Sequence, residues 1–266
     1  LQVVTAFVAE FKQDMLQHVP MLFAALFPAT LEMITKNFED FPEHRTAFFA
    51  LIQAVTDYCF ESLLKISPAE FKLVMDSVFW AIKHLDRAIQ ETGLSTLLAL
   101  INSFQRSPHA NQFFSAFLVT IVNELLEVLT DTFHRSAFAS HCTVLARVIA
   151  IVETNSVQVP LDPSGVANNS AFLRNHICTL LADSFQNLTQ PQVLAFVTSL
   201  FTHYSDNKRF KDLMKDFLIQ LKEFASFHDE IKQDERERAA AEARNAQYAL
   251  VPGLQYTRDT IDQDDG

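Results

Sequence analysis

The stretch Ser67-Pro68-Ala69-Glu70, followed by the run FKLVMDSVFWAI at 71–82, determines the fold class. A serine before a proline, with a glutamate three residues after the serine, is the signature of a helix N-terminus. The two polar side chains satisfy amide groups that have no partner in the first turn, and proline suits the first helical position. The apolar residues that follow recur at helical spacing rather than in strand-like alternation. The segment therefore predicts a helix that begins at Pro68.

The same pattern extends along the whole chain. Pro20, Pro42 and Pro108 each stand where one apolar periodic run ends and the next begins, and Thr189-Gln190-Pro191-Gln192 repeats the capping signature. The predicted helices lie near residues 1–18, 20–38, 42–60, 68–87, 89–105, 109–131, 137–152, 169–187, 190–204, 207–226 and 228–248.

Composition supports an all-α protein. Hydrophobic residues make up 49% of the 266 residues and include 25 Phe, whereas there are only 4 Gly. A many-stranded sheet needs turn residues such as glycine at short intervals, and phosphate-binding loops need closely spaced glycines, so both are excluded.

The predicted helices form a repeat. The first helix of each pair begins near residue 20, 68, 109, 168 and 207, so successive starts are 48, 41, 59 and 39 residues apart. HEAT and armadillo repeats have a period of about 40–47 residues. The longest interval contains a Pro- and Asn-rich insert at 153–168. We therefore expect an all-α HEAT-repeat superhelix (an α-α solenoid) of about five helix pairs, with a leading helix and a long C-terminal helix. The alternative is an irregular helical globule.

The C-terminal forty residues differ from the rest in charge. From residue 227 onward ten acidic residues face five basic ones, a net charge of −5, and the predicted helix at 228–248 has a thin apolar face. We expect three parts: repeats at 1–226, a long crossing helix at 227–250 and an acidic, disordered tail at 251–266.

The formal charge of the chain, −11, disfavours nucleic acid as a partner. The densest basic cluster, Lys208, Arg209, Lys211 and Lys215, alternates with aspartates, which indicates a solvated helix face. The sequence contains no run of about 18 uninterrupted apolar residues, which is the length that a membrane-spanning helix requires. Because residue 1 lies inside an apolar periodic run, we expect the chain to be a piece of a longer protein.

Motifs for catalysis, metals and cofactors are absent from the sequence. It contains no His-Glu-x-x-His, no Cys-x-x-Cys and no Gly-x-Ser-x-Gly, so we predict neither an enzyme nor a zinc or cofactor site. Cys59, Cys142 and Cys178 each lie in apolar surroundings and are interpreted as small buried hydrophobic residues. Aromatic residues inside apolar helical runs are interpreted as core rather than as a binding surface. They are Trp80, Phe104, Phe113, Phe114 and Phe117.

Several stretches together resemble the C-terminal region of the exportin-1 family, nuclear export receptors of the importin-β superfamily. They are NFEDFPEHRT at 37–46, FKLVMDS at 71–77, WAIKH at 80–84, ETGL at 91–94, FVTSLF at 196–201, DFLIQLKEF at 216–224 and VPG at 251–253. The resemblance spans nearly the whole chain in order. It is looser at 1–19 and 104–160, and Asp259 to Gly266 keeps the acidity of the family without its usual ending.

The resemblance implies a receptor that binds Ran-GTP and proteins bearing leucine-rich export signals, contacts nucleoporins, and shuttles between nucleus and cytoplasm through the nuclear pore. The signal groove and its reactive cysteine are implied to lie outside this segment, so none of the three cysteines would be that thiol. The last helix and the acidic tail are implied to restrain cargo binding. The residues assigned to this regulatory element are Asp234, Glu235, Arg236, Glu237, Asp259, Asp262, Asp264 and Asp265.

Two alternatives remain open at this point. The first is another helical-repeat carrier or scaffold, such as an import receptor or a coat-assembly adaptor, in which the same repeats would bind a different partner. The second is an enzyme with a site between helices. A deep pocket that holds converging polar groups with shifted pKa values would indicate the enzyme.

Overall fold

The computed structural model of the chain describes residues 1–36, 40–131, 137–162, 164–165, 168–185, 188–221 and Arg236. The regular structure of these residues is helical throughout, and none of the described segments forms a strand. The helices are α1 (Gln2–Phe11), the 3-10 helix η1 (Lys12–Met15), α2 (Val19–Thr35), α3 (Pro42–Tyr58), α4 (Phe60–Leu63), α5 (Pro68–Ile82), α6 (Arg87–Gln105), α7 (Ala110–Thr130), α8 (Phe138–Glu153), α9 (Asn169–Ser184), α10 (Gln190–Thr202) and α11 (Asn207–Gln220).

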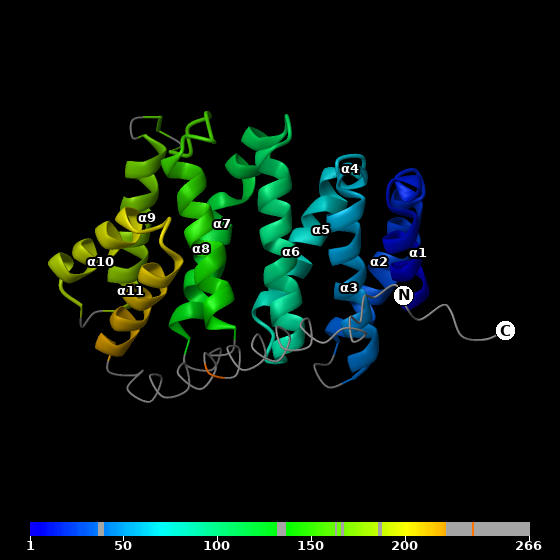
Figure 1. Cartoon of the computed structure of the whole chain (residues 1–266), viewed down its shortest axis with the longest axis horizontal. Coiled ribbons are helices and arrows are strands. Elements are labelled where there is room, and N and C mark those ends of the chain that lie inside the picture. The colour runs from blue at the N-terminus through cyan, green and yellow to red at the C-terminus, as the bar shows by residue number, and fades with distance from the viewer. Residues whose placement is uncertain are drawn as a thin grey trace, which may run out of the picture. The chain divides into compact units, whose positions relative to one another are not determined.

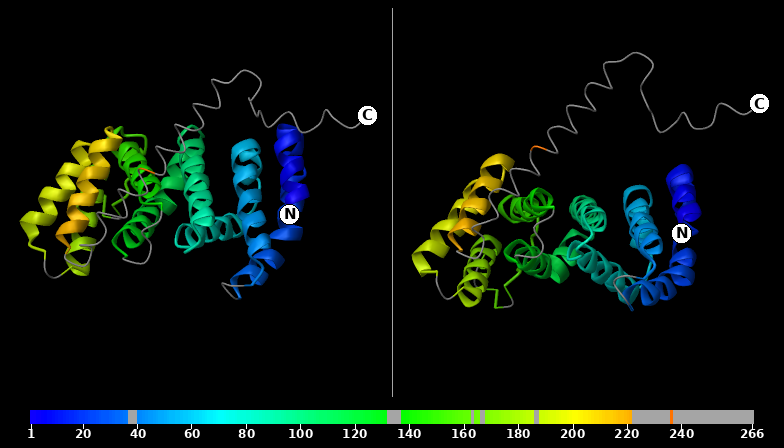
Figure 2. Two further views of the ribbon diagram at one scale, coloured as in Figure 1. Left: turned by 60° about the horizontal axis from the view of Figure 1, so that its bottom comes forward. Right: turned by 90° about the horizontal axis from the view of Figure 1, so that it is seen from below.

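The chain divides into two compact units, Leu1–Leu218 and Ile219–Gly266. In the first unit, α1, α3, α6 and α8 follow one another in a row, and each contacts the next (Figure 1). The helices α2, α5, α7 and α9 lie along the other side of this row (Figure 2). The second unit is described only at 219–221 and at Arg236. The predicted helix at 228–248 and the tail at 251–266 therefore lie outside the described residues, apart from Arg236.

The pairing of the helices confirms the predicted stack. Antiparallel pairs are α2–α3, α5–α6, α7–α8 and α9–α10, which begin at residues 19, 68, 110 and 169, and α11 follows at 207. Each amphipathic helix of such an array buries its apolar face against helices of the same and the neighbouring pair. The chain is thus an all-α protein of stacked helical repeats.

The capping signature that predicted α5 is present in the structure. Glu70 Oε2 accepts a hydrogen bond from the Ser67 amide at 2.8 Å, and Ser67 Oγ accepts one from the Glu70 amide at 3.2 Å. Hydrogen bonds to the Glu70 carboxylate from the Ser67 side chain and from the Ser67 amide favour its ionised form and lower the pKa of Glu70. At α10 the Gln192 side chain likewise accepts a hydrogen bond from the Thr189 amide, at 2.9 Å.

Helix ends differ from the prediction where tertiary contacts compete. The helix predicted at 1–18 ends at Phe11, and Lys12 adopts a left-handed φ of 45°. Two side chains from the α3–α4 region fix this turn: Cys59 Sγ donates a hydrogen bond to the Lys12 carbonyl, and Ser62 Oγ donates one to the Leu16 carbonyl. A local pattern cannot reveal contacts made more than forty residues away.

Two residues allow α2, α3, α5 and α6 to pack closely. A Cβ at Gly93 would lie 2.7 Å from the Ala81 Cβ, so only glycine permits the close approach of α6 to α5. Arg45 is buried, and its Nη2 donates hydrogen bonds to the Ile34 and Asp40 carbonyls at 3.1 and 2.9 Å. Its guanidinium lies 5.7 Å from the ring centroid of half-buried Trp80.

Polar side chains join each helix pair to the next in a regular manner. These hydrogen bonds connect residues 42 to 53 positions apart, which is about one repeat. The pairs are Gln53–Ser95, Glu91–Ser140, Asn102–Arg147, Gln105–Ser156, Asn111–Gln158 and Asn123–His176. This inter-repeat ladder is independent evidence for the period inferred from the helix starts.

The insert between α8 and α9 is fixed over its described residues. Asn169 Nδ2 donates hydrogen bonds to the Val157 and Val159 carbonyls, both at 3.0 Å, and Asn169 Oδ1 accepts one from the Leu161 amide at 2.8 Å. Val157 is buried. A single asparagine therefore satisfies three backbone groups of a connection whose described residues form no helix or strand.

Candidate partner-binding surfaces

An aromatic groove lies between the α4–α5 region and the start of α7. Its volume is about 420 Å³. It is lined by Leu63, Leu64, Ile66, Pro68, Phe71, Lys72, Phe104, His109, Gln112, Phe113, Ala116 and Phe117. Two helix pairs contribute to it, α5–α6 and α7–α8, so the stacking of repeats creates it.

Four phenyl rings form the floor and wall of this aromatic groove. Phe104 and Phe113 stack with ring centroids 4.0 Å apart, and Phe71 contacts Phe104 edge to face at 5.4 Å. Phe71 also meets Phe117 edge to face at 5.8 Å. Phe104 and Phe113 are buried, as the sequence predicted, whereas Phe71 and Phe117 are half-buried. The cluster is therefore core at its base and an apolar surface at its rim.

The rim of the aromatic groove carries little charge. Lys72 is exposed and pairs with Asp76 one turn away, at 2.7 Å. Such an exposed pair contributes little to stability and leaves the groove floor apolar. A hollow of this kind can hold an aromatic or aliphatic side chain of a partner, because burying apolar surface is favourable and the site is already formed.

A second groove, of about 540 Å³, lies between α9 and α10. Its walls are more polar and include Asn175, Thr179 and Asp183, and the exposed Leu194 stands at its edge. Cys178 also lines it. Because of this exposure, the interpretation of all three cysteines as buried is wrong for Cys178, which is half-buried, while Cys59 and Cys142 are buried. Burial raises the pKa of all three thiols.

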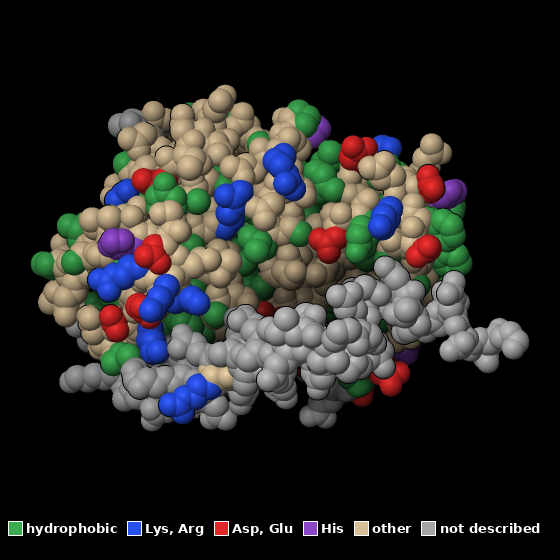
Figure 3. Space-filling view, viewed as in Figure 1, with side chains coloured by type: hydrophobic (Ala, Val, Ile, Leu, Met, Phe, Trp, Pro, Cys, Tyr) green, Lys and Arg blue, Asp and Glu red, His purple; other side chains and the backbone are tan. Residues whose placement is uncertain are grey.

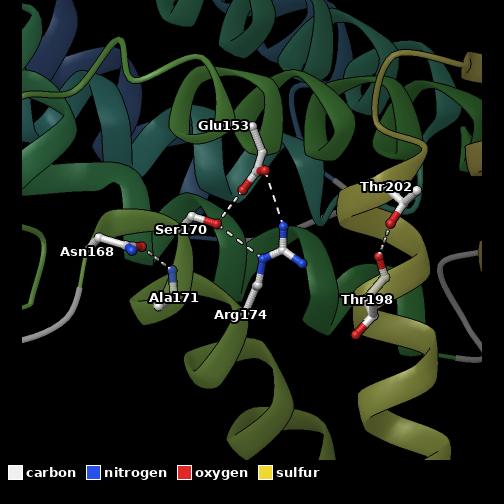
Figure 4. A network of polar contacts seen from close by, with 7 residues as sticks. All are labelled: Glu153, Asn168, Ser170, Ala171, Arg174, Thr198 and Thr202. Carbon is white, nitrogen blue, oxygen red and sulfur yellow. Dashed lines mark hydrogen bonds and ion pairs between the residues drawn. The ribbon is translucent and has the colours of Figure 1, made fainter.

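The start of α9 is held by a compact polar network (Figure 4). Glu153, the last residue of α8, accepts a hydrogen bond from the Ser170 hydroxyl. Arg174 Nη2 donates to Glu153 Oε2 at 3.2 Å, and Arg174 Nε donates to Ser170 Oγ at 3.1 Å. The Arg174 guanidinium also lies 4.3 Å from the ring centroid of Phe201 on α10. The network thus connects α8, α9 and α10.

The basic cluster on α11 is a face of mixed charge, in agreement with the sequence. Lys and Arg groups over α11 alternate with Asp and Glu groups (Figure 3). Lys208 and Arg209 are exposed, and Asp206 Oδ1 caps the helix by accepting hydrogen bonds from both of their amides. Carboxylates placed among the cations oppose the binding of phosphate groups.

The regulatory element predicted from the sequence is not placed by the structure. Arg236 is helical and exposed. Asp234, Glu235, Glu237, Asp259, Asp262, Asp264 and Asp265 lie outside the described residues. The aromatic groove is the feature that sequence reasoning missed. The sequence predicts that Phe104, Phe113 and Phe117 belong to the core, but the contact of Phe117 with Phe71 across two repeats has no local signal.

The described residues were also compared with the requirements of a metal site and of a membrane-spanning helix. Within the described ranges, no three His, Cys, Asp or Glu side chains lie together as a metal site. By length and composition α7 could span a membrane, but half of its most apolar window is buried within the stack. Its Glu124 and Asn123 pair with Lys83 and His176 of neighbouring pairs, as expected of a core helix in a solenoid.

Comparisons with known proteins agree with this architecture. Residues 1–226 match the family model described as CRM1 C terminal. Protein EXPORTIN 1B of Arabidopsis thaliana is 41% identical over 259 residues, which cover 96% of this chain and 24% of the relative. Exportin-1 of Schizosaccharomyces pombe is 40% identical over 263 residues, and Exportin-1 of Drosophila melanogaster is 37% identical over 259, with the same coverage of 96% and 24%.

The chain spans about a quarter of the length of the curated relatives that it matches. The residues that match the family model contain all the described helices from α1 to α11 and six of the seven stretches that carried the resemblance, while VPG at 251–253 lies beyond them. The chain therefore belongs to the exportin-1 family and corresponds to the C-terminal region of its members.

Proposed function

We propose that this chain supplies the C-terminal helical repeats of a nuclear export receptor that carries proteins with leucine-rich export signals in a Ran-GTP-dependent manner. The observation that carries the proposal is the match over 96% of the chain, at 37–41% identity, to proteins named exportin-1. Stacked helix pairs support it, because solenoids offer extended surfaces suited to protein partners. Such a receptor would shuttle between nucleus and cytoplasm through the nuclear pore.

Within that receptor, the segment has two proposed roles. Connections between its helices contribute to the contact with Ran-GTP, and residues 227–266 restrain cargo binding in the absence of Ran. The support for restraint is the net charge of −5 and the thin apolar face of 228–248. The residues proposed to carry it are Asp234, Glu235, Arg236, Glu237, Asp259, Asp262, Asp264 and Asp265.

Deletion of residues 228–266 in the full-length receptor tests the restraint. We expect an export-signal peptide to bind more tightly without Ran, as measured by fluorescence anisotropy, because the competing element is gone. A matched variant replaces Asp259, Asp262, Asp264 and Asp265 by asparagine, and so keeps the length but removes the charge. Affinity that is unchanged or weaker in the deletion would contradict the proposal.

The aromatic groove is the proposed contact for nucleoporins. Its four phenyl rings form an apolar surface that can receive aromatic side chains from a flexible nucleoporin segment. The substitution Phe117→Ala removes a half-buried wall of the groove, and we expect weaker retention on immobilised phenylalanine-rich nucleoporin segments. Leu73→Ala is the matched control, because Leu73 is exposed on α5 and does not line the groove. Equal losses in the two variants would argue against this contact.

A different helical-repeat carrier or scaffold is the alternative. A pull-down with the full-length protein, comparing Ran-GTP with Ran-GDP in the presence of export-signal cargo, separates the two functions. An export receptor retains cargo together with Ran-GTP. If Ran-GTP releases the cargo, the protein is an import carrier, and the export proposal fails.

A further inference from the structure

Two Ser-Pro dipeptides occur in the chain, and both lie beside the aromatic groove. Ser67-Pro68 precedes α5 and Ser107-Pro108 precedes α7. Of the 9 Pro in the sequence only these two follow a serine, and none follows a threonine. Pro68 lines the groove, and so does His109, the residue after Pro108. Because proline-directed protein kinases modify a serine that stands directly before a proline, the groove is bordered by two candidate phosphorylation sites.

Ser67 has the geometry that a kinase substrate needs. Both Ser67 and Pro68 are exposed. The Ser67 backbone is extended, with φ −65° and ψ 154°, which is the conformation that a following proline favours and in which kinases bind the residues around an acceptor serine. The hydrogen bonds between Ser67 and Glu70 are exposed to solvent, so water can replace them at little cost.

Ser107 provides a contrast within the same molecule. It is half-buried, and its Oγ donates a hydrogen bond to the Phe104 carbonyl at 3.0 Å and accepts one from the His109 amide at 3.2 Å. Phosphorylation would break the bond to Phe104, whose ring belongs to the base of the groove. Ser107 is therefore the poorer acceptor, although its dipeptide motif is the same.

We propose that Ser67 is phosphorylated by a proline-directed protein kinase, and that its phosphate weakens the binding of apolar partner segments in the aromatic groove. In the transfer, Ser67 Oγ forms a bond to the γ-phosphorus of ATP while the bond from that phosphorus to the β–γ bridging oxygen breaks. ADP leaves, and the hydroxyl proton passes to a carboxylate of the kinase. The effect on the groove rests on the function proposed above, whereas the modification itself does not.

A phosphate at Ser67 is compatible with the start of α5. Phosphoserine carries a charge of about −1.5 to −2 at neutral pH, and negative charge is favourable at a helix N-terminus. Its oxygens can accept the hydrogen bond that Ser67 Oγ accepts from the Glu70 amide. The phosphate repels the Glu70 carboxylate, but the exposed Lys65, two residues before Ser67, supplies a counter-charge. We therefore expect α5 to stay folded after phosphorylation.

The same phosphate changes the wall of the aromatic groove. Ile66 and Pro68, on either side of Ser67, both line the groove, and Lys72 at its rim already pairs with Asp76. A partner segment that covers Ile66 and Pro68 must remove water from the phosphate between them, and burying an unpaired charge is costly. The affinity for uncharged aromatic segments therefore falls, while the phenyl rings of the groove stay in place.

Phosphorylation of the full-length protein in vitro tests the site. The protein is incubated with a mitogen-activated protein kinase and Mg-ATP, then digested and analysed by mass spectrometry. We expect at least about 10-fold more phosphate on Ser67 than on Ser107, because the Ser107 hydroxyl must first give up its bond to the Phe104 carbonyl. Pro68→Ala should abolish the modification of Ser67, and Pro108→Ala should leave it unchanged. The assignment is overturned if Ser67 carries no phosphate, if Ser107 is modified instead, or if Pro68→Ala is still modified at Ser67.

The matched variants Ser67→Asp and Ser67→Asn test the effect on the groove without a kinase. Their side chains have the same shape and both cap helices well, so the two variants differ by one charge. Retention on immobilised phenylalanine-rich nucleoporin segments should be about 3-fold lower for Ser67→Asp than for Ser67→Asn, and about 5-fold lower for the phosphorylated than for the unmodified protein. Circular dichroism verifies that the two variants have the same helix content.

Phe117→Ala separates the two ways in which this experiment can fail. If Phe117→Ala lowers retention but Ser67→Asp and Ser67→Asn are retained equally, the proposed effect of the phosphate is wrong. Full retention of Phe117→Ala would instead refute the nucleoporin contact proposed above, and with it the effect on the groove. In both cases the assignment of Ser67 as the modified residue is decided by mass spectrometry alone.

Discussion

The helices α8 and α9 have equal length and are adjacent in the chain, yet they bury very different numbers of side chains. In α8 ten of 16 residues are buried, whereas in α9 three are. The difference arises from position: α8 lies in the row formed with α3 and α6 and is also contacted by α7, α9 and α10, whereas α9 packs chiefly on α10. Burial in a helical stack thus depends on how many neighbours surround a helix, and not on its length.

Leu145→Ala should produce the largest effect in this comparison. Leu145 on α8 has no exposed surface, and its removal leaves a cavity between tightly packed helices, at a cost of about 3 kcal/mol in the free energy of unfolding. Urea unfolding followed by circular dichroism measures it. Leu173→Ala on α9, also fully buried, is the control and should cost less, because fewer neighbours line the cavity. Equal costs would show that the two helices are equally constrained.

The cysteines of the two helices offer a chemical comparison. Cys142 on α8 is buried with a raised thiol pKa, and Cys178 on α9 is half-buried beside the groove at α10. Because only an accessible thiolate reacts, we expect a maleimide to label Cys178 at least about 100-fold faster than Cys142. Mass spectrometry of digested samples resolves the two sites, and Cys178→Ser identifies the fast phase. Similar rates would mean that α8 opens as readily as α9.

The N-terminus of α9 depends on its cap more than that of α8. Asn168 Oδ1 accepts a hydrogen bond from the Ala171 amide at 2.8 Å, whereas Ala137, the residue before α8, provides no side-chain cap. We expect Asn168→Ala to lower the free energy of unfolding by about 1 kcal/mol. Asn168→Ser retains an acceptor and should restore most of the loss. If Asn168→Ala and Asn168→Ser have the same free energy of unfolding, the insert rather than the cap fixes the start of α9.

The smallest expected effect is a gain in stability at the start of α8. Ala137 has a left-handed φ of 58°, a conformation that disfavours residues with a Cβ. Replacing Ala137 by Gly relieves this strain, and after the greater flexibility of glycine in the unfolded chain is counted we expect a net stabilisation of about 0.5 kcal/mol. Thermal unfolding measures the change, and Ala139→Gly within the helix should instead destabilise. If Ala137→Gly is less stable than the wild type, backbone strain at residue 137 is not the deciding factor.

The sequence predicted the helices well because their start signals are local. The serine and glutamate that cap α5 lie three residues apart, and Pro42 begins α3 where the pattern placed it. Each signal acts within one helical turn, so neighbours in space do not change it. Helix ends were less predictable, since Lys12 is turned by contacts with residues of the α3–α4 region.

The candidate surfaces could be predicted only in part. Apolar spacing identified Phe104 and Phe113 as core, but the aromatic groove exists because Phe71 and Phe117 of different repeats meet at its rim. The sequence likewise predicted a helix at 169–187 without indicating that it would bury only three side chains. Both features depend on which helices become neighbours, which the pattern within a single helix does not contain.

The inter-repeat ladder has a consequence for how the chain acquires its structure. Its bonds connect residues 42 to 53 positions apart, and the described helices contact partners from the same or an adjacent repeat. Contact order is therefore low, and chain closure over long distances is not required before stabilising contacts form. A nascent polypeptide that leaves the ribosome needs to lengthen by only one further helix pair for the previous pair to consolidate.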